Sequence, residues 1–148
     1  MAGKSAVFEN DILKLIFWGT TIANIADNAA ASPITTLYLS LHTADPTDSG
    51  NQASSEASYT GYGTTRIGLV RSASGWSISG SVVSPVATVN FPQCTGGAAQ
   101  TITHVGIGTS GAVGASGKLL FSGALSPSIL VQSGVTPQLT TATTITES

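Results

Sequence analysis

The chain has 148 residues, which is enough for one ordinary domain that buries about two-thirds of the surface exposed by its unfolded form. Asp, Glu, Lys and Arg make up only 8% of the residues, against about 25% in average soluble proteins. A net charge of −2 with five scattered basic residues argues against nucleic acid as a direct partner. A single cysteine, Cys94, excludes an internal disulfide and a zinc site built on cysteines.

The low charge means that neutral groups have to cover the exterior. The chain contains 20 Ser, 20 Thr and 17 Gly, and Lys118 carries the only formal charge between Arg71 and Glu147. Such a surface has little charge repulsion to keep copies apart, whereas soluble monomers usually carry mixed charge. We therefore expect much of it to lie against other protein chains, including further copies of this one. A monomer covered with Ser and Thr is the alternative.

Residues 5–18 have the pattern of a helix, with Ser5 as the N-cap, Glu9 near the positive end of the helix dipole and Gly19 as the C-terminal stop. The apolar side chains cover an arc of roughly 200°, wider than the stripe a helix needs to lie on one surface. We expect the helix to contact two surfaces, either inside its own domain or shared with a neighbouring chain. The side chains expected at these contacts are Phe8, Ile12, Leu15, Ile16, Phe17 and Trp18.

The same segment predicts neither a signal peptide nor a membrane span. Glu9 and Asp11 precede the apolar run, which contradicts the basic start and uninterrupted apolar core of a signal peptide. The run also contains Lys14 and is far shorter than the roughly 20 apolar residues that a span requires. We therefore expect a soluble protein that is made in a cytoplasm and has no membrane partner.

After Gly19, the sequence predicts a second short helix that ends before Pro33, with Ile22 and Ile25 facing inward. Everything after Pro33 is expected to be β structure, beginning with the alternating leucines of residues 37–42. Turns rich in Gly, Pro, Asp and Ser separate the other expected strands. These strands lie within residues 61–72, 76–92, 101–110, 117–126, 128–134 and 136–148.

Short strands at this spacing, with no helix after any of them, predict a mainly β fold. We expect an antiparallel β-sandwich or jelly-roll-like domain with an N-terminal α-helical extension. The expected organisation is one domain over residues 1–148, with a helical segment over 1–32 and the sandwich over 33–148. The polar stretch over residues 47–60 is expected to be an exposed or mobile loop.

The stretch "LYLSLHTADPTDSG", residues 37–50, places His42, Asp45 and Asp48 close together in sequence. Ligands for a metal or for acid/base chemistry have to converge from rigid elements. Here His42 is in phase with Tyr38 on a strand, while the two aspartates belong to turn sequences, one of them directly before Pro46. We interpret the stretch as the end of a strand followed by a turn.

Other motifs that resemble catalytic or phosphate-binding sequences also lack their required context. Residues 106–111 read G-I-G-T-S-G, but a further strand follows instead of the helix that would receive a phosphate. No serine lies in G-x-S-x-G. A hydrolase using carboxylates from Asp45, Asp48 and Glu56 is the remaining enzymatic alternative. The sequence favours a protein that is not an enzyme and has no catalytic residue, metal or cofactor.

The aromatic residues are scattered, which is typical of core and cross-strand pairs. Tyr59 and Tyr62 flank Gly61 beside the polar loop. They are the best candidates for an exposed aromatic pair in a binding surface.

The order of several segments resembles a family of small structural proteins of tailed bacteriophages, often labelled phage tail fibre protein. The segments that carry this resemblance are "GKSAVFENDILKLIF", "LYLSLHTADPTDSG", "GYGTTRIGLV", "TITHVGIGTSG", "GKLLFSGALS" and "VQSGVTPQL". The resemblance extends over residues 3–139. It implies a virion protein whose partners are the major capsid protein or tail proteins.

A fibre shaft usually needs long repetitive segments, and this chain has no internal repeat. We therefore expect a capsid decoration or cement protein that stabilises the shell through contacts between subunits. The alternative is a tail-tip or tail-fibre component that binds a surface through Tyr59, Tyr62 and the loop of residues 47–60.

Overall fold

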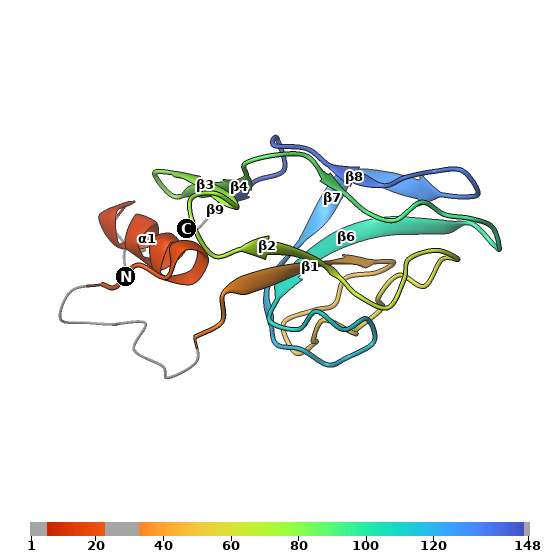
Figure 1. The fold of residues 1–148 in the computed structure, drawn as a ribbon, viewed down its shortest axis with the longest axis horizontal. Helices are drawn as coiled ribbons and strands as arrows, with labels where there is room; N and C mark the ends of the chain where they lie inside the picture. Colours follow the sequence, from red (N-terminus) through yellow and green to blue (C-terminus); the bar gives the residue numbers. More distant parts are fainter. Residues whose placement is uncertain (1–5, 23–32, 147–148) are drawn as a thin grey trace. The chain divides into compact units, whose positions relative to one another are not determined.

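The computed structural model describes residues 6–22 and 33–146, without the side chains of Ala6 and Phe8 (Figure 1). The chain is mainly β, with several antiparallel sheets and one short N-terminal helix, so the predicted fold class is confirmed. It divides into two compact units. Unit 1 comprises residues 1–36, 69–88 and 139–148, and unit 2 comprises residues 37–68 and 89–138. The division into a helical segment and one sandwich domain stays a prediction.

The N-terminal helix follows the sequence pattern closely. Helix α1 (Ala6–Leu13) continues into a π-helical turn, η1 (Lys14–Trp18). Gly19 ends it in the left-handed conformation with φ 68°, and its N–H donates to the carbonyl of Lys14. The predicted N-cap, Ser5, lies outside the described residues. None of the described helices has the length and apolar character that crossing a membrane would demand.

The second predicted helix falls on residues 23–32, which lie outside the described part of the chain together with Ile25. Its expected beginning is described and is not helical. Ile22 is buried, as predicted, but it forms an isolated β-bridge.

Unit 1 packs the helix against a small antiparallel sheet. Strands β3 (Trp76–Ser79), β4 (Val82–Pro85) and β9 (Ile145–Thr146) form this sheet in the order β3-β4-β9. The ring of Phe17 meets the ring of Trp76 edge to face, with 4.7 Å between ring centroids. The indole N–H of Trp18 donates to the carbonyl of Trp76 over 3.1 Å. Buried aromatic contacts therefore hold the end of the helix on the sheet.

Arg71 adds a polar clamp at the same end of the helix. Its guanidinium donates to the carbonyls of Leu15 and Ile16 and, over 2.7 Å, to that of Ile34. The last carbonyls of a helix have no partner within the helix, so a cationic donor stabilises them. Arg71 thereby ties the C-terminal end of the helix to the chain that leads into the first strand.

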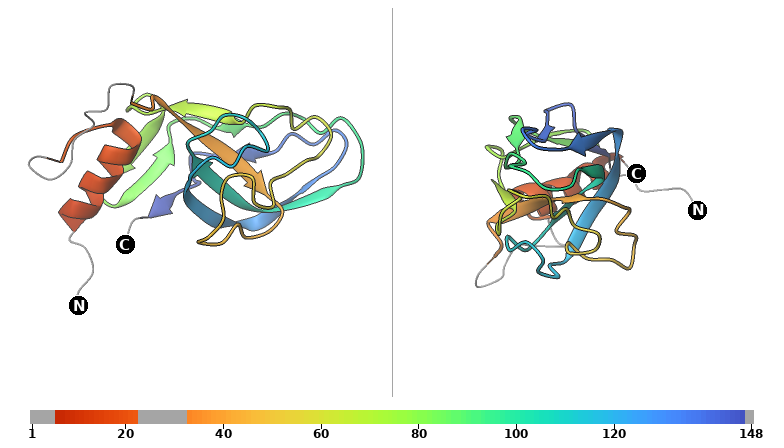
Figure 2. Two further views of the ribbon diagram at one scale, coloured as in Figure 1. Left: turned by 90° about the horizontal axis from the view of Figure 1, so that it is seen from below. Right: turned by 90° about the vertical axis from the view of Figure 1, so that its right-hand side faces the viewer.

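Unit 2 contains most of the larger sheet, which has the strand order β2-β1-β6-β7. In β1 and β6, Leu39 lies opposite Ile107 and His42 lies opposite His104. A second, two-stranded sheet pairs β5 with β8 and lies over one face of the larger sheet (Figures 1 and 2). The strand bounds are β1 Thr36–His42, β2 Ile67–Val70, β5 Val89–Asn90, β6 Gln100–Gly108, β7 Leu119–Val131 and β8 Gln138–Leu139.

Strand β7 differs from the prediction. The sequence predicts two strands with a break at Pro127, whereas the structure has one strand of 13 residues, Leu119–Val131. Proline cannot donate a hydrogen bond to a neighbouring strand, so it is tolerated at the edge of a sheet. Because β7 is an edge strand, Pro127 does not have to end it.

Gly106 shows how tightly β6 packs under the side chains of β1. A Cβ atom placed on Gly106 would lie 2.6 Å from Nε2 of His42 and 2.8 Å from Oγ of Ser40. A Cβ on Gly123, in the neighbouring strand β7, would meet no atom within 4 Å. Gly106 therefore lies in close packing and Gly123 in open space, so a substitution at Gly123 is a control for the same substitution at Gly106.

We predict that Gly106→Ala lowers the free energy of unfolding by about 1–3 kcal/mol, because the added methyl group overfills the space under His42 and Ser40. Gly123→Ala should leave it nearly unchanged. Chemical denaturation followed by tryptophan fluorescence and circular dichroism measures both. Equal stability of the two variants would contradict this packing.

Candidate functional site

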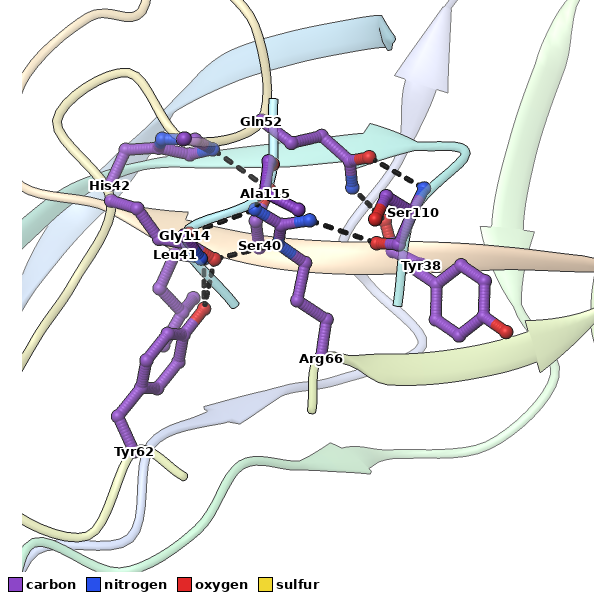
Figure 3. A network of polar contacts seen from close by, with 12 residues as sticks. Tyr38, Ser40, Leu41, His42, Gln52, Tyr62, Arg66, Ser110, Gly114 and Ala115 are labelled. Atoms are coloured by element: carbon purple, nitrogen blue, oxygen red, sulfur yellow. Dashed lines mark hydrogen bonds and ion pairs between the residues drawn. The ribbon is translucent and has the colours of Figure 1, made fainter. Parts of the chain in front are cut away.

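A buried polar network of unit 2 contains three of the functional candidates, His42, Glu56 and Tyr62 (Figure 3). The network joins the end of β1, the loop over residues 43–66 and the loop over residues 109–118. Main-chain bonds bring these segments together: the amide of Ala57 donates to the carbonyl of Leu41, and the amide of Arg66 donates to the carbonyl of Gly111. The loop of residues 43–66 therefore lies beside β1 and is fastened to the second loop.

A salt bridge between Glu56 and Arg66 forms the centre of the network. Nε of Arg66 lies 2.7 Å from Oε1 of Glu56, and Nη2 lies 2.8 Å from Oε2. The side chain of Arg66 has no exposed surface and that of Glu56 is 5% exposed. Two parallel hydrogen bonds of this kind match the planar guanidinium to the carboxylate and fix their relative orientation.

Both partners of this salt bridge also bind the main chain of the second loop. Nη1 of Arg66 donates to the carbonyl of Ser110 and Nη2 to that of Ala115, each over 2.9 Å. The amide of Gly114 donates to Oε2 of Glu56 over 2.8 Å. Buried charges need such additional bonds to offset the loss of water. The ion pair thus fixes the course of residues 110–115.

Ser40 and His42 form a second part of the network. Nδ1 of His42 lies 2.8 Å from the carbonyl of Ser54, so this nitrogen carries a proton and donates. Nε2 lies 2.9 Å from Oγ of Ser40 and is then the acceptor for the Ser40 hydroxyl. Burial lowers the pKa of His42, although the bond to Ser54 and the charge of Glu56 raise it.

A serine hydroxyl that donates to a histidine nitrogen is also the arrangement of a catalytic nucleophile and its base. Here, however, both side chains are closed off from solvent. Both Ser40 and His42 are 0% exposed, so a substrate cannot touch either side chain in this conformation. What the arrangement does is structural: it satisfies the polar groups under the loop of residues 43–66. The interpretation of His42 as a strand residue agrees with this geometry.

Gln52 explains one glycine of the G-I-G-T-S-G stretch, Gly108, and one that follows the stretch, Gly117. Its amide oxygen accepts from the amide of Ser110 over 2.8 Å, and its nitrogen donates to the carbonyl of Tyr38 over 3.3 Å. A Cβ on Gly108 would lie 2.3 Å from Cδ of Gln52, and one on Gly117 would lie 2.3 Å from its Oε1. These glycines make room for a buried glutamine.

The expectation of an exposed aromatic pair is wrong, whereas the loop over residues 47–60 is exposed in part. Tyr59 and Tyr62 are each 3% exposed, and their ring centroids lie 5.2 Å apart. The Tyr62 hydroxyl accepts from the amide of Leu41 and donates toward Glu56. Burial raises the pKa of Tyr59 to about 12. Because both side chains are buried, neither ring is available to a ligand in this conformation.

Asp45 and Asp48 belong to turns, as the sequence indicates. Oδ1 of Asp45 accepts from the amide of Thr47 over 2.9 Å, which is the bond of an Asx turn. Both carboxylates are exposed and neither takes part in the network around His42. The structure therefore does not bring the three candidates of the stretch "LYLSLHTADPTDSG" into one site.

The predicted interface on the N-terminal helix is only partly available. Phe17 is 0% exposed and packs inside unit 1, so it makes the internal one of the two contacts expected of the helix. The side chain of Phe8 lies outside the described part of the structure. The other four members keep some exposed surface, and their contact with a second chain stays a prediction; they are Ile12, Leu15, Ile16 and Trp18.

The two residues that organise the network, Glu56 and Arg66, were not predicted as a pair from the sequence. Arg66 counted only as one of five scattered basic residues, and Glu56 only as a distant catalytic alternative. A usable signal was present, because these two are the only charged residues between Asp48 and Arg71. In a chain this poor in charge, two isolated opposite charges ten positions apart indicate a buried pair.

We predict that Glu56→Gln lowers the free energy of unfolding by about 3–5 kcal/mol, because it leaves the Arg66 guanidinium buried without a negative partner. Glu9→Gln removes the same charge from helix α1 and should change it by less than about 1 kcal/mol. Urea denaturation of both variants measures the difference. A Glu56→Gln variant as stable as Glu9→Gln would show that the pair is dispensable.

The burial of His42 predicts a dependence of stability on pH. Its pKa is lower in the folded chain than the ordinary 6.5 of the unfolded chain, so below pH 6.5 the unfolded chain binds more protons. Stability should therefore fall as the pH drops from 6.5 toward the folded pKa, by at most about 1.4 kcal/mol per pH unit.

In the His42→Gln variant, the fall in stability between pH 6.5 and the folded pKa of His42 should disappear. This holds whatever the stability of the variant is at pH 8. His104→Gln removes the histidine on the neighbouring strand and should retain the fall. Denaturation midpoints measured along a pH series test both variants. Identical pH profiles for His42→Gln and the unmodified chain would rule out His42 as the responsible group.

Comparison with known proteins gives evidence of the family to which the chain belongs. A family model described as "Podophage GP4 fiber I protein gp80" matches residues 3–146. Among curated proteins, none matches the chain. The match agrees with the tail-fibre type of family that the sequence resembles, and it extends over nearly the whole length. The chain therefore belongs to the family of podophage GP4 fiber I protein gp80.

Proposed function

We propose that this protein is a non-enzymatic structural component of the fibre of a tailed bacteriophage, and that it is located in the virion. The observation that carries the proposal is the match of the fibre protein family over residues 3–146. The closed geometry around Ser40 and His42 supports a role without catalysis, because this pair, which resembles a nucleophile and its base, is buried and holds a loop.

We further propose that unit 1 attaches the protein to other virion proteins, including further copies of this chain. Among the described residues, five large apolar side chains are exposed, and four of them belong to this unit: Val7, Ile34, Val70 and Val86. Two of these, Ile34 and Val70, line one hollow together with Trp18. Apolar surface that gathers in one part of a soluble protein is typical of contacts with other chains.

Capsid decoration is the second candidate. It is supported by the absence of an internal repeat of the kind that builds a long shaft. The two roles differ in copy number and in position, since a decoration protein accompanies the capsid subunits over the whole shell whereas a fibre component is confined to the tail.

Quantitative mass spectrometry of purified virions, combined with immunogold labelling, separates the two roles. The fibre role predicts far fewer copies than the major capsid protein and gold particles at the tail. Labelling spread over the head, at a copy number comparable to that of the major capsid protein, would replace the fibre role by decoration.

A variant with Val7→Asp and Ile34→Asp tests attachment through unit 1. Both side chains are exposed, at 73% and 44%, so the fold should persist while incorporation into virions falls at least about tenfold as buried contacts are lost. Leu130→Asp makes the same chemical change at a side chain of unit 2 that is 55% exposed, and it should be incorporated normally. Full incorporation of the double variant, with an unchanged circular dichroism spectrum, would contradict attachment through unit 1.

A further inference from the structure

Strand β7 ends the larger sheet of unit 2 and has a neighbouring strand on one side only. It is 13 residues long, whereas the other strands at the edge of a sheet have two to four residues. Within the described part of the chain, no main-chain hydrogen bond joins β7 to a segment other than β6. The free N–H and C=O groups along such an edge can bond to a further strand.

The usual protection of an edge is present toward both ends of β7 but not in its middle. Lys118 directly precedes the strand, Pro127 interrupts its second half, and the register with β6 shifts on both sides of residues 121–124. Charges, prolines and bulges of this kind keep other strands away from an edge. Residues 121–124 pair regularly with β6, and residues 119–131 include no charged side chain. The middle of β7 is therefore the part at which another strand can pair.

The sequence in the middle of β7 is complementary to itself. In an antiparallel pair about a two-fold axis, a strand meets its own residues in reverse order. With the axis at Gly123, Ser122 faces Ala124 of the second copy and Phe121 faces Leu125 of the second copy. An aromatic side chain opposite an aliphatic one stabilises a pair of strands. The paired residues are all neutral, so two copies bring no like charges together.

Gly123 suits a position on such an axis. It is exposed, and a Cβ atom placed on it would meet no described atom within 4 Å. A glycine allows two main chains to approach closely, because no side chain stands between them. Its φ lies outside the left-handed region, so other residues can adopt this conformation. Larger residues can therefore replace Gly123 without disturbing the fold of a single copy.

We propose that two copies of this chain pair through residues 121–125 of β7, antiparallel about a two-fold axis at Gly123. The two four-stranded sheets then join into one sheet of eight strands, which is within the usual size of a sheet. The low net charge of −2 gives little repulsion between the copies. This interface lies in unit 2, so it is distinct from the attachment proposed for unit 1, and it does not depend on the fibre role.

Sedimentation equilibrium of the full purified chain, from about 1 to about 300 μM, tests the pairing. The unmodified chain should dimerise with a Kd on the order of 10 μM. Gly123→Asp should weaken the dimer at least about tenfold, because two carboxylates then face each other at the axis. Leu130→Asp adds the same charge to β7 at an exposed position outside the paired residues, and it should dimerise normally.

Two further measurements separate this interface from misfolding and from unit 1. Gly123→Lys alone should also weaken the dimer, and an equimolar mixture of Gly123→Asp and Gly123→Lys should restore it, because opposite charges then meet at the axis. Mixing cannot rescue two misfolded chains. The double variant with Val7→Asp and Ile34→Asp should dimerise normally, since both of its changes lie in unit 1.

Three results would overturn the proposal. These are a chain that stays monomeric at every concentration, a Gly123→Asp variant that dimerises as tightly as Leu130→Asp, and a mixture of the two Gly123 variants that stays monomeric. If the purified chain is monomeric and Gly123→Asp nevertheless blocks incorporation into virions, the edge of β7 binds an extended segment of a different virion protein instead.

Discussion

The buried ion pair between Glu56 and Arg66 is the interaction on which the loops of unit 2 depend. Its four charge-assisted bonds join residues that are far apart in sequence: Arg66 binds the carboxylate of Glu56 twice and the carbonyls of Ser110 and Ala115. A lone buried charge is strongly destabilising, so neither partner can leave without disturbing the other. The buried Tyr62 donates to Glu56, and Ser54 of the same loop accepts from His42, so the closed part of the loop adjoins this contact.

The ion pair also affects how the low content of charged residues is interpreted. Arg66 is turned inward to a carboxylate, and Arg71 is turned inward to the carbonyls at the end of the helix. Two of the five basic side chains therefore form internal bonds. The exterior thus carries even less charge than the sequence alone indicates. A neutral exterior with exposed apolar side chains in unit 1 agrees with a protein that works in contact with other chains.

Local patterns in the sequence were sufficient to predict the helix and its end at Gly19, the alternating strand β1, the strand β6 and the mainly β class. They failed where structure depends on partners distant in sequence. Tyr59 and Tyr62 lie in or beside a polar stretch and yet are buried, with the Tyr62 hydroxyl bonded to Glu56 of the ion pair. The continuity of β7 through Pro127 depends on its place at the edge of the sheet. The hollow that Thr47, Asp48 and Gly50 form with residues 119–122 combines two segments about 70 positions apart, which no local pattern connects.

Amide hydrogen exchange at Gly114 tests most directly whether the ion pair fixes the loops. Gly114 is an exposed loop residue whose amide donates to Oε2 of Glu56, so its protection depends on the pair staying formed. We predict slow exchange at Gly114 in the unmodified chain, as slow as at the strand amide of Leu41, which donates to the Tyr62 hydroxyl. Exchange of Gly114 at the rate of an unprotected loop, while Leu41 remains protected, would contradict the central place given to this ion pair.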